Sequence, residues 1–227
     1  RDASENSFEL PFPRHSAAPY VITTPCDSAG AVQATHVYRL NPLDPADLTQ
    51  GTIDAREQAH ELTHLLKTMP QFRDVRITTT APSLGLRESR RVHGVYRLGR
   101  DDLAAGQRFD DAICAVSFPV DIHKGIDHNE EAPNRAGVRM KPYEIPFRCL
   151  IPLGVEGLLL AGRCISGDHY AHASYRVTGS MMATGQAAGL AAAWAVREGR
   201  QPSEISGVRL RGDLEAHGCG FLPAGPA

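Results

Sequence analysis

Long hydrophobic runs are missing from this sequence, and so is an excess of charge of either sign. The longest apolar run, Gly189–Val196, is rich in alanine and far shorter than the roughly 18 residues that a membrane span needs. The 24 basic and 26 acidic residues leave a formal net charge of −2. The sequence therefore predicts no membrane span and no global electrostatic attraction to nucleic acid or to an anionic membrane.

Cysteine pairs and targeting signals are missing as well. The cysteines are odd in number, lie far apart and include no C-x-x-C, so they predict neither a disulfide framework nor a cysteine zinc site. They are Cys26, Cys114, Cys149, Cys164 and Cys219. The N-terminus is polar, which argues against a signal peptide. It has no initiator Met, which favours a processed or cleaved start. A reducing, cytoplasmic setting is the simplest interpretation.

Several motifs of nucleotide binding and hydrolysis do not occur in the 227 residues. There is no G-x-S-x-G elbow of a serine hydrolase and no Walker-type G-x-x-x-x-G-K-[ST] loop. The G-x-G-x-x-G fingerprint of a dinucleotide-binding half is missing too. What is present is the composition of an ordinary globular protein, with 42% hydrophobic and 22% charged residues.

The hydrophobic pattern predicts a mixed α/β (α+β) fold. Asp54–Met69 has the period of an amphipathic helix and ends before Pro70. Further helices are expected just after Asp102 and over Thr178–Arg197. The expected strands are residues 20–24, 33–40, 75–80, 92–98, 157–161 and a strand from Tyr143. Residues 111–120 are apolar enough to be buried, and loops are expected at residues 41–50 and 121–142.

A literal H-E-x-x-H falls on the first predicted helix. It places His60 and His64 on one face for zinc, with Glu61 as a base, and so offers a zinc-dependent hydrolase as an alternative function. No H-x-x-G-x-x-H extension follows, and Pro70 ends the helix at once. A solvated polar face opposite the leucines of this helix is the favoured interpretation, and no metal is predicted.

Arg87-Glu88-Ser89-Arg90-Arg91 is the densest charge cluster of the chain. One interpretation is a solvated turn with an internal ion pair. Against it, the cluster follows the apolar residues 82–86, and buried arginines require anionic partners such as a phosphate or a carboxylate. The sequence leaves a substrate-facing role for Arg87 and Arg90 and a structural ion network equally open.

A second polar cluster lies immediately before the helix expected at Thr178. It contains His169, His172, Tyr175 and Arg176, between a small-residue turn and a Gly/Ala-rich helix. Such groups can transfer protons and hold an anionic substrate, and the helix N-terminus can stabilise an electron-rich ligand. These residues are therefore the first candidates for a catalytic site.

Four blocks of sequence occur in order within about residues 84–197: RESRRVHGVYRLGRDDL, FDDAICAVSFPVDIH, YEIPFRCLIPLGVEGLLLAGRCIS and AHASYRVTGSMMATGQAAGLAAA. Together they resemble the FAD-dependent oxidoreductase family within the glutathione-reductase/fumarate-reductase-like flavoproteins. The resemblance implies FAD as cofactor and a fold in which a substrate region is inserted into a Rossmann-like FAD domain. It divides the chain into a substrate or cap region (1–142), the returning C-terminal part of the FAD domain (143–200) and a tail (201–227).

The resemblance also implies roles for individual residues. Residues of the turn after the expected strand 157–161 would contact the FAD chain, and the start of the following helix would offer its backbone to the flavin ring. The implied cofactor-binding residues are Ala161, Gly162, Arg163, Cys164, Val177, Thr178, Gly179, Ser180 and Met181. The implied catalytic residues are His172, Arg176, His169, Tyr175, Arg87 and Arg90. Relatives of the fumarate-reductase type carry an acidic residue after the Ala-Gly, whereas this chain has Arg163.

The expected function is that of the C-terminal portion of an FAD-dependent oxidoreductase, which transfers a hydride from a small polar substrate to flavin N5. His172 or His169 would act as acid or base, and Arg176 with Arg87 would orient the substrate. Because the glycine fingerprint is missing, the expected partner is an N-terminal FAD-binding half on the same or a separate chain. A non-catalytic interaction domain with a degenerate flavoprotein fold is a further alternative function. The sequence leaves the oligomeric state open, including a homo-oligomer.

Overall fold

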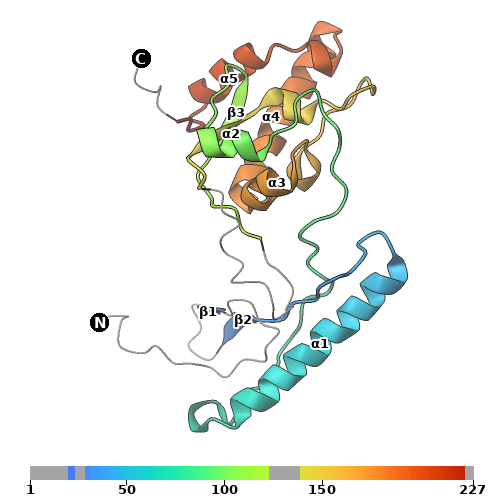
Figure 1. Ribbon diagram of the computed structural model, residues 1–227, viewed down its shortest axis with the longest axis vertical. Coiled ribbons are helices and arrows are strands. Elements are labelled where there is room, and N and C mark those ends of the chain that lie inside the picture. Colours follow the sequence, from blue (N-terminus) through green and yellow to red (C-terminus); the bar gives the residue numbers. More distant parts are fainter. Residues whose placement is uncertain (1–19, 24–28, 123–138, 223–227) are drawn as a thin grey trace, which may run out of the picture. The chain divides into compact units, whose positions relative to one another are not determined.

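The structure, a computed structural model, describes residues 20–23, 29–122 and 139–222, with side chains from residue 29 onward. It mixes helices with small antiparallel sheets, as the sequence predicts (Figure 1). The described residues form two compact units, one ending at Leu86 and the other beginning at Arg87. Across the described ranges, no helix combines the length and the apolar character required to cross a membrane.

The first unit contains one long helix and a small sheet. Strand β1 (Tyr20–Thr23) pairs antiparallel with β2 (Gly30–Gln33), and helix α1 (Pro45–Lys67) is followed by the short helix η1 (Pro70–Phe72). The helix predicted at 54–69 is confirmed, but it begins nine residues earlier, so the loop predicted at 41–50 is wrong in its second half. The side chain of Asp44 caps the helix and Pro45 occupies its first turn, two signals for an early start.

The core of the second unit is a two-stranded sheet covered by helices. Strands β3 (Ala112–Val116) and β4 (Tyr143–Pro146) pair antiparallel, and α4 (Thr178–Glu198) and α5 (Gly207–Ala216) pack against β3. The remaining elements are α2 (Arg100–Ala105), η2 (Phe147–Leu150), η3 (Gly162–Cys164), α3 (His169–Tyr175) and η4 (Pro202–Glu204). The helix over Thr178–Arg197 and the strand from Tyr143 are confirmed as α4 and β4, and the helix expected after Asp102 is α2, which begins at Arg100. The burial expected within residues 111–120 is confirmed for β3, which was not predicted as a strand.

Four segments predicted as strands do not form them: residues 33–40 beyond Gln33, and residues 75–80, 92–98 and 157–161. The segment 92–98 shows why. Its amides donate to carbonyls of two other segments: Val92 to Cys164 (3.0 Å) and Leu98 to Ser166 (3.3 Å), but Val95 to Ile151 (2.9 Å) and Tyr96 to Arg148 (3.2 Å). A segment that changes partner every few residues has extended residues but no continuous ladder.

Two helices of the second unit were not predicted. Helix α3 lies where a loop was expected, and α5 lies in the region expected to be a polar tail. Each begins with a side-chain cap, since Asp168 accepts from the amide of Ala171 and Ser206 accepts from that of Arg209. In α5 the buried Leu210 and Leu214 are one helical turn apart, which is the pattern of a short amphipathic helix.

Candidate functional site

The charge cluster at 87–91 lies beside the polar cluster of α3 because backbone hydrogen bonds hold their flanking segments together. The amide of Val92 donates to the carbonyl of Cys164 (3.0 Å), and the amide of Asp168 donates to that of Leu98 (2.8 Å). The carboxylate of Asp168 also accepts from the amides of Arg100 and Ala171, so it joins the starts of α2 and α3. Two clusters that lie about 80 residues apart in sequence therefore form one site.

Glu88 connects the two clusters directly. Its carboxylate forms an ion pair with Arg91 and lies 3.3 Å from Nδ1 of His169, the first residue of α3. Partial burial acts to raise the pKa of Glu88, but hydrogen bonding and the charge of Arg91, with smaller effects from His169, hold it below its ordinary value. Glu88 is thus an ionised acceptor beside a histidine whose side chain is 51% exposed.

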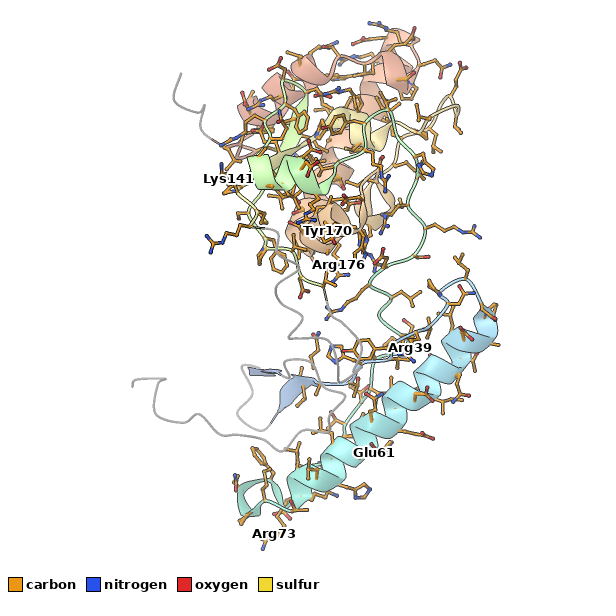
Figure 2. All side chains as sticks on the ribbon, viewed as in Figure 1. Arg39, Glu61, Arg73, Lys141, Tyr170 and Arg176 are labelled. Atoms are coloured by element: carbon orange, nitrogen blue, oxygen red, sulfur yellow. The ribbon has the colours of Figure 1, made fainter. Side chains whose placement is uncertain are left out.

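Arg87 and Arg176 converge on a single carboxylate. The guanidinium of Arg87 lies 3.3 Å from Oδ2 of Asp121, and that of Arg176 lies 3.5 Å from the same atom. Arg176, the C-cap of α3, is labelled with Tyr170 in Figure 2. Burial, reinforced by repulsion from Arg87, lowers the pKa of Arg176, although an arginine remains charged at neutral pH. Two guanidinium groups thus share the carboxylate of Asp121.

His172 lies beneath these charges and is almost completely buried. Its residue is 1% exposed, and neither Nδ1 nor Nε2 has a hydrogen-bond partner among the described residues. Burial lowers the pKa of His172 to about 4, with Glu88 opposing the shift and Arg91, Arg176 and His169 adding to it. The ring is therefore neutral at pH 7.

Tyr175 and Arg90 differ in their exposure to solvent. Tyr175 is fully buried, its hydroxyl donates to the carbonyl of Ile165 (3.1 Å), and burial raises its pKa. Its ring packs so closely on Gly167 that a Cβ there would lie 2.7 Å from it. Arg90, by contrast, is exposed and forms no ion pair within the described residues. Tyr175 is therefore withdrawn from solvent, whereas Arg90 is accessible to it.

The turn after residues 157–161 is tied to the first half of α4. The amide of Gly162 donates to Oγ1 of Thr184 (2.9 Å), a buried residue on α4. Gly162 has φ of 79°, in the left-handed region that favours glycine. A Cβ built at Gly162 or at Gly179 would meet no described atom within 4 Å. Both backbones are thus open to an approaching ligand.

The other residues expected to bind the cofactor lie along the same two segments. Ala161–Cys164 form the turn, and the thiol of Cys164 donates to the carbonyl of Ala161 (3.3 Å). Val177 is the N-cap of α4 and supplies no side-chain cap, so the first amides of this helix are left for another acceptor. Thr178 and Gly179 are exposed there, and Ser180 and Met181 are partly exposed.

Four residues of the site are not among the catalytic and cofactor-binding residues predicted from the sequence. Asp121 and Glu88 contact partners more than 30 residues away, so no local pattern reveals their roles. Thr184 is one of several small residues of α4, and its role appears only when Gly162 lies against it. Asp168 carried a signal that could have been used, because Asp is a preferred N-cap residue and here its side chain accepts from the amide of Ala171, three residues later.

The H-E-x-x-H residues do not form a metal centre in this structure. His60, Glu61 and His64 are all exposed on α1, where Glu61 is labelled in Figure 2. In the described part of the chain, no three His, Cys, Asp or Glu side chains come together in a way that could hold a metal ion. A zinc hydrolase requires a third protein ligand, which these ranges do not provide.

The candidate site thus combines a glycine turn hydrogen-bonded to the first half of a long helix of small residues with the arginines and histidines in and beside α3. The profile of the FAD dependent oxidoreductase family matches residues 7–214, and the chain belongs to this family. Its cofactor is FAD. Comparison with curated proteins gives no match, and neither does comparison with solved structures.

The residues present fit this cofactor. The left-handed Gly162 and the exposed Gly179 leave room for close backbone approach, and the uncapped start of α4 offers N–H groups to electron-rich atoms. Arg163 is exposed and stands where the resemblance calls for an acidic residue, so ribityl binding by a carboxylate at that position is not available here.

Proposed function

We propose that this chain forms the flavin-ring and substrate side of an FAD-dependent oxidoreductase that oxidises a small polar substrate by hydride transfer. The observation that carries the proposal is the convergence of Arg87 and Arg176 on one carboxylate, immediately before the open start of α4. When bound, FAD supplies the hydride acceptor at N5. Backbone groups of Ala161–Cys164 and of Val177–Met181 would hold it.

The substrate carries an anionic group in this proposal. Among the described residues, the two ion-pair networks contain the three arginines Arg87, Arg91 and Arg176 and the two carboxylates of Glu88 and Asp121, which leaves one excess positive charge there. A substrate carboxylate can balance this charge by taking bidentate hydrogen bonds from a guanidinium group. Arg176 orients the substrate, and Arg87, which pairs with the same oxygen of Asp121, assists it.

His169 accepts the substrate proton. Of the two histidines, His169 is half exposed and has a carboxylate on Nδ1, whereas His172 is buried. A base must come within hydrogen-bond reach of the proton that it removes, which favours the accessible ring. His172 serves as a neutral side chain that supports α3 beneath the site, and Tyr175 fixes the same helix to Ile165.

In this proposal, the remaining part of the FAD site lies in a dinucleotide-binding half, on the same chain or on a separate chain. An exposed stripe along α4 supports this, with Met182 71% and Val196 85% exposed. The stripe continues through the exposed residues Thr178, Gly185, Gly189 and Ala192. Small residues allow close packing of another element. A second copy of this chain is the competing partner for this stripe.

A cytoplasmic location stays a prediction.

The proposal is tested by expressing this chain together with a dinucleotide-binding half and adding small hydroxy and amino carboxylates without oxygen. A yellow complex whose flavin band bleaches with one of these substrates supports the proposal. A well-folded, colourless complex that binds no FAD contradicts it and favours a non-catalytic interaction domain.

A further inference from the structure

We propose that Glu88 is a positioning residue that keeps the ring proton of His169 on Nδ1 and thereby leaves Nε2 as the nitrogen that takes the substrate proton. The inference rests on the proposed function for the role of Nε2. In this inference, the charge cluster at 87–91 orients a histidine of α3, which is different from a solvated turn and from a patch that binds substrate directly.

The contact between the two side chains fixes the tautomer. Nδ1 of His169 lies 3.3 Å from Oε2 and 3.4 Å from Oε1 of Glu88. An ionised carboxylate can only accept hydrogen bonds, so Nδ1 must carry the proton in this contact. In a neutral ring the other nitrogen then holds the lone pair and is the base.

The acceptor is itself held in place and ionised. Arg91 forms an ion pair with Glu88, and their side chains are 21% and 34% exposed, respectively. A carboxylate that is partly withdrawn from water and paired with a guanidinium group stays charged at neutral pH. Arg91 pairs with Oε1 of Glu88, and Oε2 is left available to Nδ1 of His169.

The backbone around both residues limits their movement. The segment after Glu88 is joined to the loop before α3 through Val92 and Cys164, and Leu98 accepts from the amide of Asp168. His169 follows directly on Asp168, whose side chain caps α3. Orientation of a base by a fixed second group is the usual way in which an enzyme selects one imidazole nitrogen.

The test reads the ring tautomer of His169 by nitrogen-15 NMR on the full chain, at a pH where the ring is neutral. The wild-type ring should carry its proton on Nδ1. Glu88→Ala removes the acceptor, and the ring should change toward the Nε2–H form that free imidazole side chains favour. Glu88→Gln retains an acceptor oxygen and should give an intermediate population, which protects the test if Glu88→Ala folds poorly.

Arg91→Gln is the matched control, because it removes the other partner of the ion pair but retains the carboxylate of Glu88 as an acceptor for His169. It should retain the Nδ1–H form, whereas general disorder of the segment would alter both variants alike. In the assembled flavoprotein, Glu88→Ala should lower kcat by roughly tenfold to a hundredfold with little change in KM. A wild-type ring in the Nε2–H form, or a Glu88→Ala ring that stays Nδ1–H, overturns the inference.

The tautomer is read without substrate, so its outcome is separate from that of the proposed function. If Glu88→Ala changes the tautomer while His169→Asn oxidises substrate at the wild-type rate, the pairing is supported and His169 is not the proton acceptor. In that case the role assigned to Nε2 is overturned, and the failure belongs to the proposed function.

Discussion

Arg176 donates a hydrogen bond to the backbone carbonyl of Asp121 and also lies 3.5 Å from the carboxylate of that residue. The side chain of Arg176 is only 12% exposed, so its charge is held by a residue 55 positions earlier in the sequence. The same carboxylate meets Arg87. Asp121 therefore positions both arginines that we propose to bind the anionic group of the substrate.

Arg176→Gln should raise KM for an anionic substrate by roughly tenfold to a hundredfold, because one charge-assisted contact with the substrate is lost. The measurement is steady-state oxidation in the assembled flavoprotein. Arg90→Gln, which removes an exposed arginine with no ion pair among the described residues, should leave KM unchanged. Equal effects of the two variants would show that only the general positive charge matters.

Gly162→Ala should reduce the FAD content of the purified protein. The left-handed backbone costs an alanine about 1 kcal/mol, and a Cβ would occupy space that is open in the structure. Gly154→Ala is the matched control, because Gly154 has φ of 70° and equally open space at its Cβ. If both variants lose the same stability and retain the same FAD content, Gly162 does not lie against the cofactor.

His172→Leu should stabilise the second unit and reduce its acid sensitivity. The pKa of His172 falls from its ordinary value of 6.5 to about 4 on folding, so only the unfolded chain binds a proton between these values. Stability is thus complete above pH 6.5 and decreases as the pH falls toward 4, by roughly 3 kcal/mol in total. Urea unfolding at pH 7 and pH 5 measures this. The difference between the two pH values should be smaller in His172→Leu, and an unchanged difference would contradict the assignment.

Arg211→Ala should destabilise the fold by roughly 2–4 kcal/mol, because it removes a partner of a buried carboxylate. Glu144 is 1% exposed and accepts from Arg211 at 3.2 Å and 3.3 Å, while Arg108 is farther away at 3.7 Å. Glu215→Ala removes the exposed partner of Arg211 and should cost well under 1 kcal/mol. Similar losses in the two variants would argue against the buried pair as the main contribution.

The parts of the fold that the sequence predicts are those whose signal is local. Helix α4 and the buried β3 are recognisable from apolar periodicity and composition alone. The segment 92–98 is rich in strand-forming residues, but its hydrogen bonds go to two distant segments, residues 148–151 and 164–166, which no local pattern reveals. Helices α3 and α5 are short, and their caps at Asp168 and Ser206 carry more of the signal than their periodicity does.

The same distinction applies to the site. His169 and Arg176 are predicted because they are close together in sequence and precede a helix. Their partners Glu88 and Asp121 lie 81 and 55 residues away, so the sequence presents them only as an internal ion pair and as one residue of an expected loop. Burial separates His169 from His172, and this difference follows from packing of α3 that no sequence pattern specifies.

The most direct test of the account is a single-turnover measurement of flavin reduction in the assembled protein, with substrate that carries deuterium on the carbon to be oxidised. The account predicts that the flavin is reduced, that deuterium slows the reduction, and that His169→Asn slows it further. A flavin that stays oxidised while the carbon–deuterium bond remains intact, in a protein that holds FAD and binds the substrate, would contradict it.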